Sequence, residues 1–259
     1  MGFLEIAPPW LLTGFIFFIG LAVGSFLNVC IYRMPIAQSV VSPRSHCPSC
    51  KSLIRVQDNV PVISYILLRG KCRQCGASIS PVYPLVELGA GVLFAAVFIK
   101  FGIAWQTPIF WVVAAALVAV AAIDLKHKII PDRITLPGIV FGLAAGTYLI
   151  GFRESLTGFF VGGGLFYAIA VLSKGGMGGG DIKLIAAAGA LLGWQKTLLV
   201  IFLASFLGSC VGIPLILAGR KHGKSQIPFG PFLAAGIIAA IFSGDSLIQL
   251  YLRIMTGNI

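Results

Sequence analysis

The chain has 259 residues, of which 58% are hydrophobic and only 10% are charged, and its mean hydropathy is +0.98. These values exclude a soluble globular domain and predict an all-α polytopic membrane protein embedded in a lipid bilayer. The net charge of +11 does not call for a nucleic-acid partner. Loop charge bias and contact with anionic lipid headgroups account for it.

Apolar runs close to the roughly 20 residues needed to cross a bilayer recur along the whole chain. They predict about eight transmembrane helices, of which the sixth is short, at residues 10–31, 84–102, 107–123, 134–151, 156–172, 184–193, 197–218 and 227–241. Glycines four residues apart, such as Gly142/Gly146 and Gly158/Gly162, predict that several of these helices pack closely. Asn28, inside the first span, is interpreted as a hydrogen-bonding link to another helix.

The basic residues indicate which face is cytoplasmic. If the chain crosses eight times, 15 of the 19 Lys and Arg residues fall in loops on one face. The excess of Lys and Arg in cytoplasmic loops then places residues 33–83 in the cytoplasm and both termini on the outer side.

The loop at 33–83 contains two cysteine pairs, Cys47/Cys50 and Cys72/Cys75, separated by 21 residues. Each short turn presents two sulfurs to one tetrahedral ion, so the spacing predicts a structural four-thiolate zinc site. A cytoplasmic location argues against disulfides. We therefore expect three parts: a first span at 1–32, a small zinc-binding domain at 33–83 and a membrane-embedded core at 84–259.

Two further acidic residues, Glu87 and Asp132, lie near the starts of predicted transmembrane helices. Glu87 enters the second span near its cytoplasmic end, where we interpret it as a support residue for a site or as a partner of a loop cation. Asp132 follows a proline and precedes an apolar run, which favours an N-cap over a catalytic role.

The strongest candidate site is formed by Asp124 and Asp181. Each lies where an apolar helix meets a cytoplasmic loop. A carboxylate at such a position raises the free energy of the folded protein unless it is paired or hydrated, so it indicates a functional site. Asp181 is preceded by glycines at 175, 176, 178, 179 and 180, which include Gly178, Gly179 and Gly180 directly before it. We expect these glycines to adopt backbone conformations closed to other residues and to let main-chain groups approach an extended substrate. Two carboxyls at one membrane face suggest an aspartyl-type hydrolase, and the prolines at 228 and 231 predict a broken helix entry facing it.

Taken in order, these motifs resemble those of bacterial type IV prepilin peptidases, which are Gly-x-Gly-Asp intramembrane aspartyl proteases. The resemblance covers about residues 24–236. It rests on Gly24-Ser25-Phe26-Leu27-Asn28, the two cysteine pairs, Tyr83-Pro84 with Glu87, Asp124 with Ile130-Pro131-Asp132, Gly178-Gly179-Gly180-Asp181, and Pro228-Phe229-Gly230-Pro231-Phe232.

The resemblance implies that Asp124 and Asp181 are catalytic and that the enzyme lies in the bacterial cytoplasmic (inner) membrane. It also implies cleavage of the basic leader of prepilins or pseudopilins after a glycine, followed by N-methylation from S-adenosylmethionine. No cofactor pocket is indicated by the residues themselves, and the zinc loop with its helix junctions is the expected location. The sequence does not indicate an oligomeric state.

Alternatives from other classes remain at this point. Asp124 and Asp181 would carry protons or metal ions in a transporter with a cytoplasmic zinc site. A metal-stabilised assembly protein without chemistry would tolerate their replacement by Asn. The four-Cys loop disfavours an archaeal preflagellin peptidase, and the absence of a Tyr-Asp pair at Asp124 disfavours a presenilin-like protease.

In a peptidase the two carboxyls would titrate as a unit, so neither is assigned as acid or base.

Overall fold

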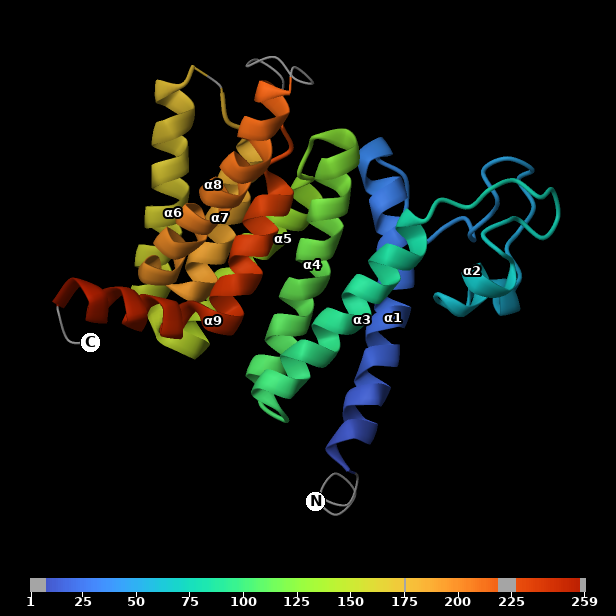
Figure 1. Cartoon of the computed structure of the whole chain (residues 1–259), viewed down its shortest axis with the longest axis horizontal. Helices are drawn as coiled ribbons and strands as arrows, with labels where there is room; N and C mark the ends of the chain where they lie inside the picture. The colour runs from blue at the N-terminus through green and yellow to red at the C-terminus, as the bar shows by residue number, and fades with distance from the viewer. Residues whose placement is uncertain (1–7, 175, 219–226, 257–259) are drawn as a thin grey trace. The chain divides into compact units, whose positions relative to one another are not determined.

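The computed structural model describes residues 8–174, 176–218 and 227–256, and in this part of the chain it contains helices and two isolated β-bridges (Figure 1). The chain divides into two compact units, Met1–Ala119 and Val120–Ile259. Helix α4 (Gln106–His127) continues from the first unit into the second.

The first unit contains two long helices, α1 (Pro9–Arg33) and α3 (Val82–Phe101), joined by the loop at 33–83. This loop forms only short elements: η1 (Met34–Ile36), η2 (Val56–Asn59) and α2 (Ile63–Leu67). Pro9 opens α1, since its fixed φ suits the first helical position and its missing N–H has no partner to lose. The isolated bridges, His46 with Leu53 and Lys71 with Ser78, lie in the two cysteine turns of the loop.

Helices α1 and α3 pack closely through small residues. A Cβ atom added to Gly20 would lie 2.7 Å from the Cα of Gly91, and one added to Gly24 would lie 2.6 Å from the Cα of Glu87. The Asn28 side chain donates a hydrogen bond of 3.0 Å to the carbonyl of Tyr83. Gly20 and Gly24 are four residues apart, so they fit the predicted close packing of helices at such glycines, which is confirmed here, as is the interhelical role of Asn28. In lipid, the hydrophobic effect does not drive helices together, so van der Waals contacts and hydrogen bonds hold α1 against α3.

The second unit is built around the short helix α7 (Gly179–Leu192). Its other helices are α5 (Asp132–Ile150), α6 (Phe152–Leu172), α8 (Trp194–Leu217) and α9 (Gly230–Thr256), with the end of α4. Gly162 of α6 faces Ile185 of α7 and Gly158 faces Gly189, so these two helices run antiparallel. Gly142 of α5 faces Ala187, and most residues of α7 from Leu184 onward are buried.

Seven of the described helices are long and apolar enough to cross a membrane, and α7 is not among them. The expected short sixth span is this helix, which begins at Gly179 and has 14 residues. At 1.5 Å per residue it rises only about 20 Å, less than the hydrocarbon thickness of about 30 Å. Protein surrounds it instead of lipid, because α5, α6 and α8 contact it, so it needs no full-length apolar surface.

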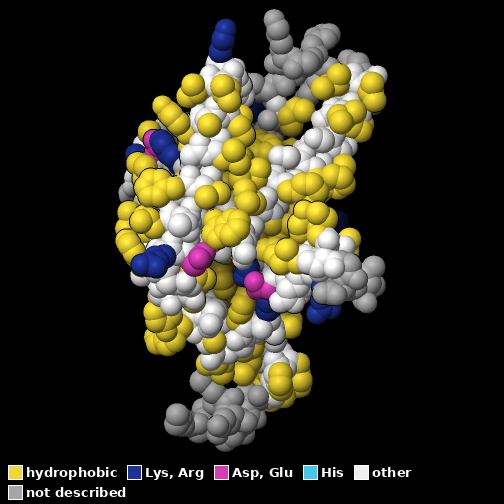
Figure 2. All heavy atoms as spheres, turned by 90° about the vertical axis from the view of Figure 1, so that its left-hand side faces the viewer, with side chains coloured by type: hydrophobic (Ala, Val, Ile, Leu, Met, Phe, Trp, Pro, Cys, Tyr) yellow, Lys and Arg dark blue, Asp and Glu magenta, His cyan; other side chains and the backbone are white. Residues whose placement is uncertain are grey.

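The outward surface agrees with a membrane environment. Large hydrophobic side chains are widely exposed, including Phe160, Phe202 and Phe206 at 57–65%. Figure 2 shows one face of the molecule on which hydrophobic side chains predominate and few charged ones are visible. A surface of this kind would be an aggregation liability in water and is expected where lipid chains are the solvent.

Candidate active site and metal site

Asp124 lies near the end of α4 with 5% of its surface exposed. Its Oδ2 accepts a hydrogen bond of 2.7 Å from the backbone N–H of Gly230. Gly230 is the first residue of α9, where backbone N–H groups have no partner within the helix. The carboxyl of Asp124 satisfies one of them, so the start of α9 orients this side chain.

Gly230 leaves no room for a side chain at this contact. A Cβ atom there would lie 2.8 Å from Oδ2 of Asp124 and 3.1 Å from its Cβ. Residues 227–229 are not helical and α9 begins only at Gly230, which confirms that the chain enters α9 from a broken segment facing Asp124. The sequence offered one signal for this contact, a glycine between two prolines, but did not indicate its partner.

Asp181 is the third residue of α7, and its backbone N–H donates to the carbonyl of Gly178 over 3.1 Å. Its Oδ1 is buried and has no hydrogen-bond partner among the described residues. The carboxyl of Asp124 lies near enough to act on it electrostatically. Asp124 is buried and Asp181 is partly buried, and Gly180 beside Asp181 packs against Ile130, which follows the end of α4. The second unit therefore brings the starts of α7 and α9 to the end of α4, where the two sequence-predicted acids lie.

Of the three glycines directly before Asp181, two are required for space, and none is required for unusual backbone angles. Gly178 has φ −72° and ψ 139°, which any residue adopts, and neither Gly179 nor Gly180 has a positive φ. The expectation of conformations closed to other residues is therefore wrong for these three and for Gly176, and position 175 lies outside the described residues. A Cβ on Gly178 would lie 2.8 Å from Oδ2 of Asp181, and one on Gly180 would lie 2.7 Å from the Cβ of Ile130. A Cβ on Gly179 would meet nothing within 4 Å.

Asp132 is the first residue of α5, and the N-cap position is occupied by Pro131 without a side-chain cap. The N-cap prediction is therefore wrong by one residue. The carboxylate instead forms an ion pair of 2.6 Å with Nζ of Lys183. It still lies at the positive end of a helix dipole. Lys183 comes two residues after Asp181, so this pair links the start of α5 to the first turn of α7.

Glu87 lies in the first unit and is 8% exposed. Its Oε2 accepts a hydrogen bond of 2.7 Å from the N–H of Val62, and the side chains of Ser25 and Asn28 also hydrogen-bond its carboxyl. Val62 has φ 62°, which is unusual for a β-branched residue and is sustained by surrounding contacts. Glu87 thus anchors the loop to α1 and α3, and does not pair with a loop cation.

The four predicted cysteines meet in one cluster. Their Sγ atoms all lie within 4.8 Å of one another, and those of Cys47 and Cys75 are 3.9 Å apart. Four sulfurs around a tetrahedral zinc ion would be separated by about 3.8 Å, whereas a disulfide requires about 2.05 Å. The donor set therefore fits a metal ion.

The two cysteine turns share one backbone geometry. In each, the residue after the second cysteine donates its N–H to the carbonyl of the first, over 2.9 Å in both cases: Lys51 to Cys47 and Gly76 to Cys72. Both donors have left-handed φ, 59° and 71°. The Ser52 hydroxyl, 2.9 Å from Sγ of Cys50, lowers the pKa of that thiol to about 6, which favours the thiolate that metals bind.

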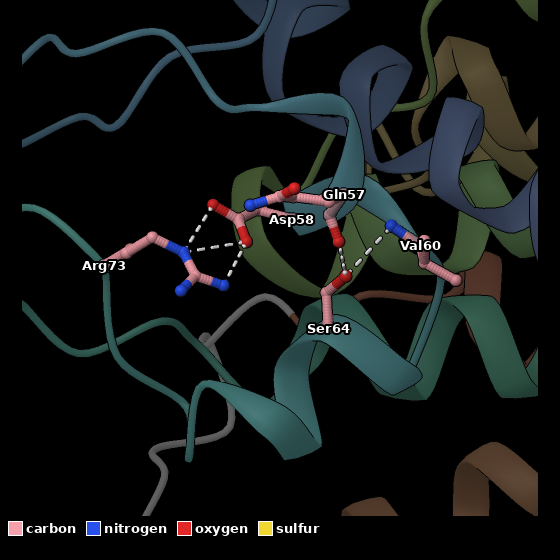
Figure 3. A network of polar contacts seen from close by, with 5 residues as sticks. All are labelled: Gln57, Asp58, Val60, Ser64 and Arg73. Atoms are coloured by element: carbon pink, nitrogen blue, oxygen red, sulfur yellow. Dashed lines mark hydrogen bonds and ion pairs between the residues drawn. The ribbon is translucent and has the colours of Figure 1, made fainter.

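A polar network ties the second cysteine turn to the rest of the loop (Figure 3). Arg73 binds both carboxylate oxygens of Asp58, with Nη2 at 2.7 Å from Oδ1. The hydrogen bonds from Arg73 hold the pKa of Asp58 below its usual range. The Ser64 hydroxyl donates to the carbonyl of Gln57 and accepts from the N–H of Val60, both at 3.0 Å. These bonds fix η2 and α2 relative to the metal site.

Comparison with known proteins agrees with this architecture. Residues 18–101 match the bacterial peptidase A24 N-terminal domain, and residues 111–213 match the type IV leader peptidase family. The chain is 38% identical to the prepilin leader peptidase/N-methyltransferase of Aeromonas hydrophila, with 96% of this chain and 97% of that protein covered. It is 36% identical to the proteins of the same name from Stutzerimonas stutzeri (91% and 92% covered) and Bacillus subtilis strain 168 (93% and 98%). No solved structure matches the chain.

The helical membrane fold and the matched families together define a membrane-embedded peptidase. The chain belongs to the type IV leader peptidase family. This confirms the family resemblance inferred from the motifs, and the transporter alternative is not supported.

Proposed function

We propose that this protein cleaves the basic leader from type IV prepilins and pseudopilins after a glycine, and then methylates the new N-terminal amine. The observation that carries the peptidase is the pair formed by the buried Asp124 and the partly buried Asp181, with Gly230 bound to the first and the Gly178 turn beside the second. The names of the relatives supply the substrate class and the methyl transfer.

Hydrolysis by this pair follows from its chemistry. Two nearby carboxyls do not both ionise easily, so they share one proton. The ionised member takes a proton from a water molecule as the water attacks the scissile carbonyl, while the protonated member donates its proton to the carbonyl oxygen. As the resulting diol collapses, the carboxyl that took the proton from water donates it to the amide nitrogen, and the other carboxylate takes the proton of a diol hydroxyl. The C–N bond breaks, the leader is released with a new carboxyl terminus, and the pair returns to its starting state.

The substrate must be extended at the scissile bond, since a helical peptide keeps its carbonyls in internal hydrogen bonds. Space beside Gly179, where an added Cβ would meet nothing within 4 Å, supports approach of a peptide main chain next to Asp181. We therefore assign Gly178, Gly179 and Gly180 to the substrate side of the site, and expect the pilin helix to unwind locally there.

Zinc is the metal that we propose for Cys47, Cys50, Cys72 and Cys75, because four thiolates in tetrahedral geometry are typical of structural zinc sites. Bound zinc would supply folding energy to the loop at 33–83, which has little core of its own. In this proposal residues 33–83 form a metal-stabilised domain after the first span at 1–32, and residues 84–259 form the peptidase core.

Methyl transfer requires S-adenosylmethionine as the methyl donor. In the described part of the chain there is no β-strand, and hence no strand followed by a glycine turn of the dinucleotide-binding kind. The relatives' names alone support this activity, and we assign no residue to the cofactor.

We propose a bacterial inner-membrane location with the metal loop and both acids on the cytoplasmic side. The antiparallel course of α7 against α6 supports counting α7 as an eighth crossing, which would place both termini on the outer side. The basic turn at 220–224, which contributes to the charge bias, lies outside the described residues. A prepilin keeps its basic leader inside by the same charge rule, so its scissile bond would reach this face.

The test is a cleavage assay with the purified full-length protein in lipid and a prepilin that carries a basic leader and a Gly-Phe junction. Mass spectrometry would compare wild type with Asp124→Asn and Asp181→Asn, with Asp245→Asn as a control. We expect wild type and the control to cut after the glycine and both site variants to be inactive. Added S-adenosylmethionine should increase the product mass by one methyl substitution. Cleavage by either site variant at the wild-type rate would contradict the proposed pair.

A further inference from the structure

The short helix α2 in the metal loop has the reverse of the usual amphipathic pattern. Ile63, Ile66 and Leu67 form one face, defined here as the apolar face of α2, and they are 49%, 65% and 75% exposed. The polar Ser64 on the other side is buried and hydrogen-bonded within the loop. Val56 and Val60 in the preceding segment are also exposed. A water-facing helix would present its serine and bury its isoleucines.

The depth of α2 along the helices is fixed by the buried Glu87. Its carboxylate binds the N–H of Val62, the residue directly before α2. Glu87 lies five residues into α3, which corresponds to about 7.5 Å along that helix. Helix α3 has 20 residues, about the length that spans the hydrocarbon core, so Glu87 lies below the end of the span. Figure 1 shows α2 level with α1 and α3, not beyond their ends.

The charges around α2 are those of a surface that binds anionic lipid. The loop at 33–83 carries seven Lys and Arg residues and a single acid, Asp58. That acid is paired with Arg73, while Arg55, Arg69 and Lys71 are exposed beside η2 and α2. Arg69 and Lys71 form no ion pair among the described residues. Basic residues next to apolar side chains are typical of helices that lie in the headgroup layer.

We propose that the apolar face of α2 inserts into the boundary between headgroups and acyl chains, and that Arg55, Arg69 and Lys71 bind anionic headgroups. Other occupants fit the charge less well. A basic prepilin leader would be repelled by this loop, and so would the same loop of a second copy. The metal domain is then a peripheral membrane module fastened to α3 at Glu87, and not a water-exposed appendage. This inference concerns lipid contact only and does not depend on the proposed peptidase activity.

The test uses the full-length protein in nanodiscs of phosphatidylcholine, with or without a minority of phosphatidylglycerol. The photo-crosslinking residue benzoylphenylalanine would replace Ile66, or Gln74 as a matched exposed position in the second cysteine turn. After illumination, mass spectrometry would identify the adducts. We expect several-fold more lipid adduct at position 66 than at 74, enriched in phosphatidylglycerol when it is present.

A charge variant separates headgroup binding from apolar insertion. Arg69→Gln combined with Lys71→Gln should abolish the enrichment in phosphatidylglycerol while adducts with phosphatidylcholine persist at position 66. Equal lipid adducts at positions 66 and 74 would overturn the proposal. So would adducts at 66 formed mainly with another part of the chain, with a second copy or with an added prepilin, because each shows that protein covers this face.

Discussion

At the scale of single residues, the three glycines before Asp181 do not have equal roles. Alanine at 178 would place its Cβ 2.8 Å from Oδ2 of Asp181, and alanine at 180 would place it 2.7 Å from Ile130. We predict that Gly178→Ala and Gly180→Ala lower kcat/KM for prepilin cleavage by roughly 100-fold, the effect of a displacement of about 1 Å in a catalytic group. Gly14→Ala in α1, where an added Cβ meets nothing within 4 Å, is the matched control and should retain activity, as measured by rates of product formation. Activity of Gly178→Ala and Gly180→Ala equal to that of Gly14→Ala would show that space at these two positions has no part in placing Asp181.

A similar prediction concerns Gly230, which contacts the other acid of the site, Asp124. Gly230→Ala would push a methyl group against the carboxylate of Asp124 and lengthen or break the 2.7 Å hydrogen bond from the backbone N–H. We expect a fall of roughly 100-fold in kcat/KM with a smaller effect on KM, since the change moves a reacting group. Gly164→Ala in α6, where an added Cβ meets nothing within 4 Å, is the control. If Gly230→Ala cleaves at the rate of Gly164→Ala, the start of α9 does not orient Asp124.

At the scale of elements, the ion pair between Asp132 and Lys183 joins α5 to the first turn of α7. Its side chains are 57% and 36% exposed, so it contributes at most about 1 kcal/mol to stability. We predict that Asp132→Asn lowers kcat but leaves the thermal midpoint close to the wild-type value, because the pair orients the turn that carries Asp181. The charge exchange Asp132→Lys with Lys183→Asp should recover part of the activity.

Asp245→Asn is a matched control for this prediction, because Asp245 forms a similar exposed ion pair with Lys196 between α9 and α8. It should leave both kcat and the thermal midpoint near the wild-type values. If Asp132→Asn is as active as Asp245→Asn, the first pair is a surface contact and has no part in orienting α7.

The sequence predicted most of the helices because apolar runs of membrane length need no tertiary information to be recognised. It predicted the metal ligands for a similar reason, since the spacing of Cys47/Cys50 and Cys72/Cys75 is local. The contact between Gly230 and Asp124 joins residues 106 positions apart, and no local pattern encodes it. Likewise the positive φ of Val62 accompanies its hydrogen bond to Glu87, 25 positions further along the chain.

At the scale of the whole molecule, the metal cluster and the carboxyl pair lie in different compact units. The first unit contains all four clustered cysteines and Glu87, and the second contains Asp124, Asp181 and Gly230. Since each unit has its own packed core, a change at the metal site should loosen the loop at 33–83 without unfolding the helices around α7.

Cys72→Ser in the full-length protein tests this separation. We predict loss of the bound metal, measured by elemental mass spectrometry, because a tetrahedral site with three thiolates binds far more weakly. Amide hydrogen exchange should become faster across residues 44–80, while α7 and the start of α9 keep their protection. Cys210→Ser is the control, since Cys210 lies in α8 outside the cluster, and it should change neither measurement. Faster exchange in α7 after Cys72→Ser would mean that the metal domain stabilises the peptidase core as well, and that the two units unfold as one.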